Sequence, residues 1–282
     1  MKTIIKNMVL GCFALSLLPA ITACSGDELP QPIKRPRTML TLTTDWTGVD
    51  KGEKPNSYVV NINENQYTVE NGDNVYELKT NESYAISSYT FAENITITDS
   101  IAKVGTSKTE VSSPTAINGL PGTLYGTYSR IDNLEGATSS LSLKMKQLTH
   151  DLNVTISNDV SVNSGYAVLN GVASSVNLKT GESSGSEDAV TEVRIATNAK
   201  GEQEITVPFR LLGLDKSATH TLTIYLSLAD GTSKTIVTDL SSYLSNFGQT
   251  TAPLNIASGV ALSSIMSGVN NWQGVNAGTI KL

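Results

Sequence analysis

The sequence has very little cysteine, and what it has lies near the start of the chain. Cys12 and Cys24 are the two cysteines among 282 residues. One falls within an apolar N-terminal segment and the other directly behind it, so we expect no disulfide and no thiolate metal site in the folded chain. Without disulfides the fold depends on the size of its hydrophobic core, and a chain of this length can bury a core that is large enough.

Histidine and aromatic residues are also scarce, which limits the chemistry that we expect. The two histidines, His150 and His220, lie among threonine and leucine without metal-ligand spacing, so we interpret both as ordinary strand residues. The Ser- and acid-rich segment 181–189 lacks the spacing of a Ca²⁺ loop and is interpreted as a solvated loop. We expect no enzyme, no metal and no cofactor. Paired acids from distant strands leave a hydrolase open as a weaker alternative.

The charge balance and the missing apolar runs exclude further classes. The formal net charge of −6 argues against nucleic acid or anionic lipid as a partner. After residue 23 no stretch approaches the roughly 18 apolar residues of a membrane span. Residues 1–23 carry two early lysines and then an apolar run, which is typical of a signal peptide. Its removal would leave 259 residues with a net charge of −8.

The end of this signal is unusual. Residues 21–24 read ITAC, a branched aliphatic and two small residues before Cys24, which resembles the lipobox of bacterial lipoproteins. We therefore expect residues 1–23 to be a lipoprotein signal peptide and Cys24 to be the lipid attachment point. Several acyl chains, at about 0.8 kcal/mol per buried methylene, give a stable membrane anchor. Residues 24–38 hold three prolines and are expected to form an extended tether. The alternative is an ordinary signal with a chance cysteine nearby.

Two-residue alternation of apolar and polar side chains dominates the rest of the chain. Leu152, Val154 and Ile156 form one such run, and residues 205–211 and 222–228 form two more. This period indicates strands with one buried face. Asn-Gly and Asp-Gly pairs at 71–72, 118–119, 170–171 and 230–231 are turn signals. The sequence predicts an all-β chain of two tandem β-sandwiches with very little helix. The one expected helix spans 239–248.

The expected domain boundary has a local signature. Leu141, Leu143 and Met145 are odd-numbered, whereas Leu148 and the following apolar residues are even-numbered. One extra residue turns all later side chains to the other face, so we predict a bulge or a crossing between two sheets near Gln147. We accordingly expect an N-terminal β-sandwich over 39–140 and a C-terminal β-sandwich over 141–282.

Several strand-like segments follow one another in a recognisable order. The phrases KMKQLTHDLNVTISN (144–158), HTLTIYLSLADGTSKTIVTDLSSYL (220–244) and VNNWQGVNAGTIKL (269–282) follow one another in the second half. This series resembles the fimbrillin superfamily of Bacteroidales surface lipoproteins, the subunits, anchors and tips of their pili. The phrase LTLTTDWTG (40–48) looks like the first domain of the anchor or accessory branch. The resemblance implies two transthyretin-like sandwiches in tandem, at the outer membrane and the cell surface.

The resemblance also implies partners and processing sites. In shaft subunits of that family, a trypsin-like protease removes the lipid and a first strand, and the C-terminal strand of the next subunit fills the groove. Arg37 and Lys51 are the candidate cleavage residues here. The segment released after Arg37 is proline-rich and a poor strand, so only a cut at Lys51 would free residues 40–46. We therefore expect an anchor or accessory subunit that keeps its lipid, with other pilus subunits and a host or bacterial receptor as partners.

The leading hypothesis is thus a non-enzymatic surface lipoprotein in pilus assembly, anchoring or cell adhesion. The alternative is a glycan-binding surface lipoprotein that serves nutrient uptake. A glycan binder should show two or three coplanar exposed rings in a cleft. An assembly subunit should show an apolar groove under a displaceable strand.

Overall fold

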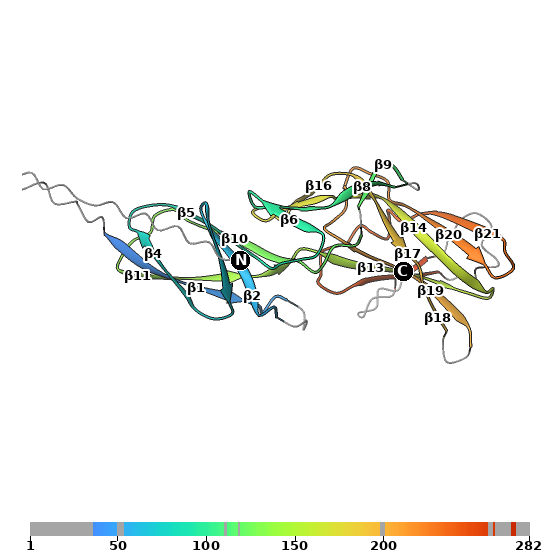
Figure 1. Cartoon of the computed structure of the whole chain (residues 1–282), viewed down its shortest axis with the longest axis horizontal. Helices are drawn as coiled ribbons and strands as arrows, with labels where there is room; N and C mark the ends of the chain where they lie inside the picture. Colours follow the sequence, from blue (N-terminus) through green and yellow to red (C-terminus); the bar gives the residue numbers. More distant parts are fainter. Residues whose placement is uncertain are drawn as a thin grey trace, which may run out of the picture. The chain divides into compact units, whose positions relative to one another are not determined.

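The described part of the chain is all-β (Figure 1). The computed structural model describes residues 36–49, 54–109, 112–117, 119–197, 201–258, 262 and 272–274. Within these ranges the strands form five sheets and no α-helix occurs. None of the described residues belongs to a helix that is long and apolar enough to cross a membrane. The all-β class predicted from the alternating pattern is therefore confirmed.

Eight strands between Arg37 and Gln147 form two sheets, with strand orders β11-β1-β4 and β12-β10-β5-β2-β3. An apolar cluster that includes Leu40, Tyr58, Ile86 and Leu143 is contributed by both sheets, and we call it the first core. The strands are β1 (Arg37–Asp45), β2 (Ser57–Ile62), β3 (Asn65–Glu70), β4 (Asn74–Lys79), β5 (Tyr84–Tyr89), β10 (Tyr125–Ile131), β11 (Thr138–Lys144) and β12 (Lys146–Gln147).

The other strands form three sheets. Their orders are β18-β19-β13-β22-β23, β21-β20-β14-β17-β9-β8 and β16-β15-β7-β6. The strands are β6 (Ile95–Thr98), β7 (Ile101–Val104), β8 (Thr106–Thr109), β9 (Ser112–Ile117), β13 (His150–Ser157), β14 (Val162–Val172), β15 (Ser175–Asn177), β16 (Ser183–Ser184), β17 (Glu187–Glu192), β18 (Arg194–Thr197), β19 (Gln203–Leu211), β20 (Thr221–Leu228), β21 (Ser233–Asp239), β22 (Leu254–Ser258) and β23 (Trp272–Gly274).

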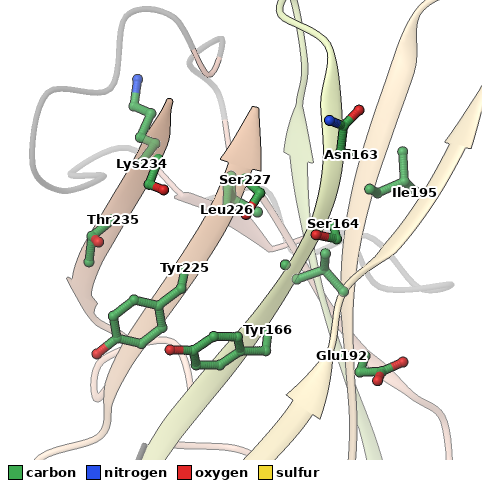
Figure 2. Close-up of a pocket in the computed structure, with 13 residues that line it drawn as sticks. Asn163, Ser164, Tyr166, Glu192, Ile195, Tyr225, Leu226, Ser227, Lys234 and Thr235 are labelled. Atoms are coloured by element: carbon green, nitrogen blue, oxygen red, sulfur yellow. The ribbon is translucent and has the colours of Figure 1, made fainter. Parts of the chain in front are cut away.

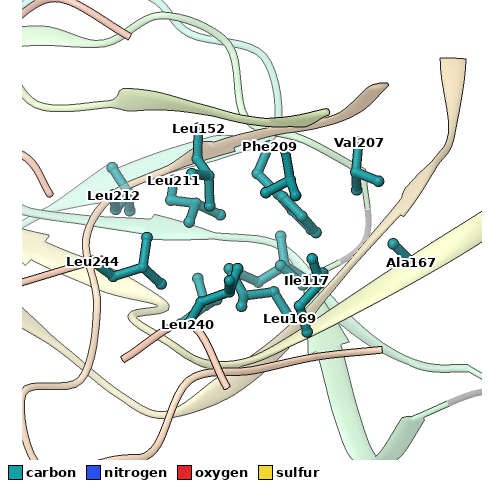
Figure 3. Close-up of a cluster of buried hydrophobic side chains, with 14 of the residues drawn as sticks. Ile117, Leu152, Ala167, Leu169, Val207, Phe209, Leu211, Leu212, Leu240 and Leu244 are labelled. Atoms are coloured by element: carbon teal, nitrogen blue, oxygen red, sulfur yellow. The ribbon is translucent and has the colours of Figure 1, made fainter. Parts of the chain in front are cut away.

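These three sheets share a larger apolar cluster, which we call the second core (Figure 3). Phe209 lies in it with 1% of its surface exposed, next to fully buried Leu152 and Leu169. The buried residues come from every second position of β13, β19 and β20, as the alternation predicts. Full burial of such a side chain contributes about 1.5–3 kcal/mol, so this cluster is a main source of stability.

The phase change near Gln147 is a crossing between sheets. Leu143 and Met145 are buried in the first core, whereas Leu148 and Leu152 belong to the second core. The chain passes from β12, which pairs with β10, to β13, which pairs with β19 and β22. The prediction of a crossing between two sheets is therefore confirmed, and its cause is the one-residue shift in parity.

Strands β6 to β9 lie outside the pairing expected from their place in the sequence. Although they fall within residues 39–140, β7 pairs with β15 and β9 pairs in parallel with β17. Ala102, Val104 and Ile117 are buried in the second core. Figure 1 shows β8 and β9 beside strands of the second half. The chain thus leaves the first two sheets after β5 and returns to them at β10.

Two local predictions were wrong. Residues 239–248 form turns rather than a helix: Tyr243 and Phe247 each donate to the carbonyl three residues earlier, and only Leu244 makes a bond four residues back, to Leu240. The predicted turn at 170–171 lies inside β14, where the register shifts between Leu169 and Val172. Gly171, with a φ of 72°, forms a β-bulge there, which also needs a left-handed residue.

Several predictions fall outside the described residues. These are the signal peptide, Cys24 with most of the tether, and the candidate cleavage residue Lys51.

Candidate functional site

The first strand of the described chain occupies a central position in its sheet. β1 pairs in parallel with β11 from Met39 to Asp45 and antiparallel with β4 from Arg37 to Leu42. A parallel pair normally needs a long crossover connection, and here about 90 residues separate the two strands. An N-terminal strand inserted between two later strands is an element whose removal would leave a slot with two unpaired edges.

The face of β1 that points inward is apolar. Leu40 and Leu42 are 0% and 2% exposed and belong to the first core. Thr38 is also buried, and its hydroxyl donates to the Gly136 carbonyl at 2.6 Å. Two buried leucines contribute roughly 3–6 kcal/mol together. The strand is therefore held by hydrogen bonds on both edges and by apolar contacts on its inner face.

Trp46 directly follows β1 and is buried beside the slot. Its indole is 6% exposed and meets Tyr58 and Tyr125 edge to face, with centroids 6.3 and 5.7 Å away. The indole Nε1–H donates to the Thr44 hydroxyl at 3.0 Å. Asp45 accepts the Thr47 amide, and this bond lowers the pKa of the Asp45 carboxyl. Trp46 is therefore part of the first core.

Arg37, the candidate cleavage residue within the described chain, is the first residue of β1. Its guanidinium lies 3.6 Å from the Glu77 carboxylate, and both side chains are more than half exposed. It is opposite Lys79 in the β1–β4 pair. The Tyr84 hydroxyl accepts the backbone N–H of Lys79 and donates to its carbonyl. Burial raises the pKa of the Tyr84 hydroxyl. A cut after Arg37 would leave Thr38 to Asp45 in the sheet, so it would not open the slot.

A second candidate site is a depression of about 640 Å³ on the face of the sheet that contains β14 and β20 (Figure 2). Tyr166 and Tyr225 lie directly opposite each other in the register, with ring centroids 4.7 Å apart and planes at 23°. The rings are stacked on each other rather than spread in one plane. They do not form the coplanar platform that the glycan-binding alternative requires, because each covers a face of the other.

The two histidines line one depression of about 1,220 Å³ despite their separation in sequence. The His150 ring contacts the Thr250 carbonyl at 3.2 Å, and the His220 ring contacts the Asn170 carbonyl at 3.4 Å. Among the described residues, no group of three or more His, Cys, Asp or Glu could hold a metal ion. The sequence could not show that the two rings share a surface, because distant loops bring them together.

Residues 181–185 of the same depression match the Gly-x-Ser-x-Gly spacing of nucleophile elbows, a match that the loop interpretation did not use. Such an elbow joins a strand to a helix and needs a base beside the serine. Here Ser183 and Ser184 form the short strand β16, paired with β15. The Ser184 hydroxyl lies 2.8 Å from the Ser175 hydroxyl. The local structure is a hairpin, and no elbow geometry is present at these residues.

Solved structures with a similar fold span most of the chain. A candidate adhesin from Bacteroides ovatus has a TM-score of 0.61 at 13% identity, covering 90% of this chain and 99% of that one. A candidate polysaccharide-binding protein from Bacteroides thetaiotaomicron has a TM-score of 0.56 at 10% identity, covering 84% and 95%. The fimbrial anchor protein Mfa2 from Porphyromonas gingivalis has a TM-score of 0.54 at 10% identity, covering 85% and 98%. At these identities the likeness shows the fold.

The family is shown by a sequence model. A comparison with curated proteins found no match. The model of the fimbrillin-A associated anchor proteins Mfa1 and Mfa2 matches residues 45–278, which is most of the chain. The match includes the second core, most of the first core and the crossing near Gln147. It begins at the last residue of β1, so Leu40 and Leu42 of the first core lie outside it. The chain therefore belongs to this family of fimbrillin-A associated anchor proteins.

Proposed function

We propose that the protein is a lipid-anchored surface subunit that holds a pilus or adhesive fibre at the outer membrane and performs no catalysis. The observation that carries the proposal is the slot of β1, in which an N-terminal strand sits between two later strands over buried Leu40 and Leu42. A strand held in this way joins the folded part to the N-terminal tether, whereas in strand addition it would have to leave the slot before a partner strand could enter.

The strands are arranged as two transthyretin-like β-sandwiches in tandem. Two separate apolar cores support this arrangement, as does the crossing near Gln147 close to the expected boundary at 140. Strands β6 to β9 would belong to the second sandwich, since they pair with β15 and β17. The first sandwich would then consist of residues 39–91 and 125–147, and the second of 95–117 with 150–282.

Attachment to the membrane is assigned to the acylated sulfur and amine of Cys24. The signal peptide 1–23 would be removed, and residues 24–38 would carry the folded part away from the lipid surface. Because β1 begins at Arg37, the tether would have little more than a dozen residues between lipid and sheet. At about 3.1 Å per residue in a proline-rich chain, its reach is on the order of 40 Å.

In this role β1 stays in its own slot. A cut after Arg37 would remove the lipid but leave β1 joined to the rest of the fold. A cut after Lys51 would detach both the lipid and β1. The partner would then be a pilus subunit that attaches at another surface or strand edge, and a receptor on a host or bacterial cell would be reached through the fibre. Retention of Cys24 and of β1 distinguishes this anchor from a shaft subunit.

The decisive experiment determines the mature N-terminus by mass spectrometry in the outer-membrane fraction and in sheared surface fibres. An anchor starts at acylated Cys24 in the membrane fraction. A start at Thr38 or Gly52 in sheared fibres contradicts the anchor role. Cys24→Ala should release the protein from the membrane, while the matched variant Cys12→Ala should leave its location unchanged. Equal retention of both variants would contradict lipid attachment at Cys24.

A second experiment tests whether β1 has to leave its slot. Thr41 and Val75 are opposite residues of the antiparallel β1–β4 pair, so Thr41→Cys with Val75→Cys can lock the strand by a disulfide. If the anchor keeps β1, cells should carry as many surface fibres when the disulfide of the double variant is formed as when it is reduced. Loss of fibres in the locked protein, but not in either single variant, would show that β1 is displaced.

A further inference from the structure

A row of polar side chains crosses one face of the sheet β12-β10-β5-β2-β3, on the side away from the first core. Gln66 of β3 lies opposite Asn61 of β2, Asn61 lies opposite Ser87 of β5, and Ser87 lies opposite Tyr128 of β10. Residues directly opposite in a sheet point to the same face, so the four side chains form one line across four strands. The intervening residues Val60 and Ile86 point to the first core, which places the row on the other side.

The hairpin of β6 and β7 covers this row and turns it into a groove. Asn61, Ser87 and Tyr128 line a depression of about 540 Å³ together with Asp99 and Ser100 of the hairpin turn. Both turn residues have positive φ, 51° and 63°, the geometry of a tight two-residue hairpin. The size is within the range of small-ligand sites, which measure about 300–1,000 Å³.

Lys179 forms one wall of the groove. Its ammonium nitrogen lies 5.3 Å from the centre of the Tyr128 ring, a cation–π distance. Glu64 and Asp99 are the carboxylates among the lining residues. The lining therefore carries two acids and one lysine that is engaged with a ring, and this balance disfavours an anionic ligand.

One acceptor in the row has no partner. Asn61 donates from Nδ2 to the Ser87 hydroxyl at 3.4 Å, but its Oδ1 is buried and makes no hydrogen bond. Because this oxygen is closed to solvent, the exposed amide of Gln66 is the group of the row that is most open to a ligand. Side-chain amides both donate and accept, which suits them to sugar hydroxyls.

An adjoining depression of about 490 Å³ extends the groove past Gln66, Tyr89 and Ile97, which line both. It contains Phe91, which is 64% exposed and the most exposed large apolar side chain among the residues that the structure describes. A ring held open to solvent beside a polar groove offers a flat apolar surface to the C–H face of a sugar.

At β2 and β5 the groove cannot bind a partner by strand addition. β2 is paired with both β3 and β5, and β5 with both β2 and β10, so their backbone groups are used. β3 and β6, which flank the groove, are edge strands, but over β2 and β5 a ligand has to be recognised by side chains. We propose that this groove, from Tyr128 through Asn61 and Gln66 to Phe91, binds an uncharged oligosaccharide. Binding would rest on hydrogen bonds from the amide row to the sugar hydroxyls and on one stacking ring, Phe91, rather than on a platform of coplanar rings.

The test uses the full-length chain in detergent and four neutral hexasaccharides, built from β-1,4-glucose, α-1,4-glucose, xylose or mannose. Isothermal titration calorimetry gives the affinities, and saturation-transfer NMR gives the sugar protons in contact. At least one hexasaccharide should bind with a millimolar or lower dissociation constant. Phe91→Ala and Gln66→Ala should each weaken that binding about tenfold, the loss of about 1.4 kcal/mol. Both residues are exposed, so folding should be unaffected.

Tyr67→Ala is the matched control. Tyr67 is also an exposed aromatic residue, but it lies opposite Val60 and therefore on the first-core side of the same strand as Gln66. Binding unchanged in Tyr67→Ala and weakened in the other two variants supports the groove. No binding by any of the four sugars overturns the proposal. It is also overturned by equal effects in all three variants, or by binding of an acidic hexasaccharide alone.

Discussion

Met145 donates its backbone N–H to the carbonyl oxygen of Asp45 at 2.8 Å. Asp45 is the last residue of β1, and Met145 lies between β11 and β12, just before the chain crosses to the second core. The end of the first strand is therefore tied directly to the crossing. A partner that displaced β1 would break this bond together with the parallel pairing to β11, so the slot and the connection between the cores are coupled.

Leu42→Ala tests how strongly β1 is held. The side chain is 2% exposed, and truncation of a buried leucine leaves a cavity, so we expect the free energy of unfolding to fall by about 2–5 kcal/mol. Urea denaturation followed by circular dichroism measures it. Met39→Ala, at a residue of the same strand that is 43% exposed, is the control and should change it by less than about 0.5 kcal/mol. Equal effects would mean that β1 is not anchored through its inner face.

Gly171 and Gly231 form a matched pair for the bulge in β14. Both have positive φ, but a Cβ at Gly171 would lie 2.8 Å from the His220 ring, whereas a Cβ at Gly231 meets nothing within 4 Å. Gly231→Ala should cost only the backbone strain, about 1–2 kcal/mol. Gly171→Ala should cost the same strain plus the displacement of His220. Thermal unfolding of both variants gives the difference, and equal losses would contradict the steric role of the bulge.

Tyr76→Phe should leave stability unchanged or raise it by up to about 1 kcal/mol. The Tyr76 hydroxyl is buried without a hydrogen-bond partner, and burial raises its pKa to about 12. Tyr84→Phe is the contrasting change, because the Tyr84 hydroxyl accepts the Lys79 amide at 2.9 Å and donates to the Lys79 carbonyl. Its loss should cost about 1–2 kcal/mol. Chemical denaturation distinguishes them; a larger loss in Tyr76→Phe would reveal a partner for that hydroxyl.

The unfolding free energy should fall on acidification through the pKa of His150. Burial lowers the pKa of this ring, against the smaller opposing effects of the Thr250 carbonyl and Asp151. The unfolded chain then takes up the proton at a higher pH than the folded chain. The stability from neutral His150 is complete above the ordinary pKa of about 6.5 and is lost as pH falls toward the lower folded value. Urea denaturation at a series of pH values from about 8 to 5 gives the unfolding free energy as a function of pH. This free energy should depend less steeply on pH in His150→Gln than in the unchanged protein, and an equal dependence would contradict the role of His150.

The sequence predicted what depends on local parity. Alternation placed Leu152, Val154 and Ile156 on one buried face, and the odd-to-even change near Gln147 located the crossing between the cores. The prediction for residues 239–248 failed because apolar spacing of three and four also fits successive turns that pack Leu240 and Leu244 inward. An Asn-Gly pair specifies positive φ, but a bulge satisfies that need as well as a turn does.

Long-range pairing was beyond the sequence. Nothing in residues 95–117 indicates that β7 will pair with β15 or β9 with β17, because strand propensity does not name a partner strand. The polar row from Gln66 to Tyr128 likewise arises from the register of four strands. Each residue alone looks like an ordinary outward-facing position. The sequence alone indicated the family and the strand-like pattern of residues 40–46. The groove could be found only from the pairing and register of the strands.

The departure of β6 to β9 into the second core and the return of the chain at β10 have a mechanical consequence. The backbone passes between the cores three times, before β6, before β10 and after β12. A pull that tends to separate the cores is therefore shared among three covalent spans in parallel, and no single hinge bears it alone. In the proposed role, with the membrane at one end and a fibre at the other, this interleaved path would make the junction between the cores resistant to extension.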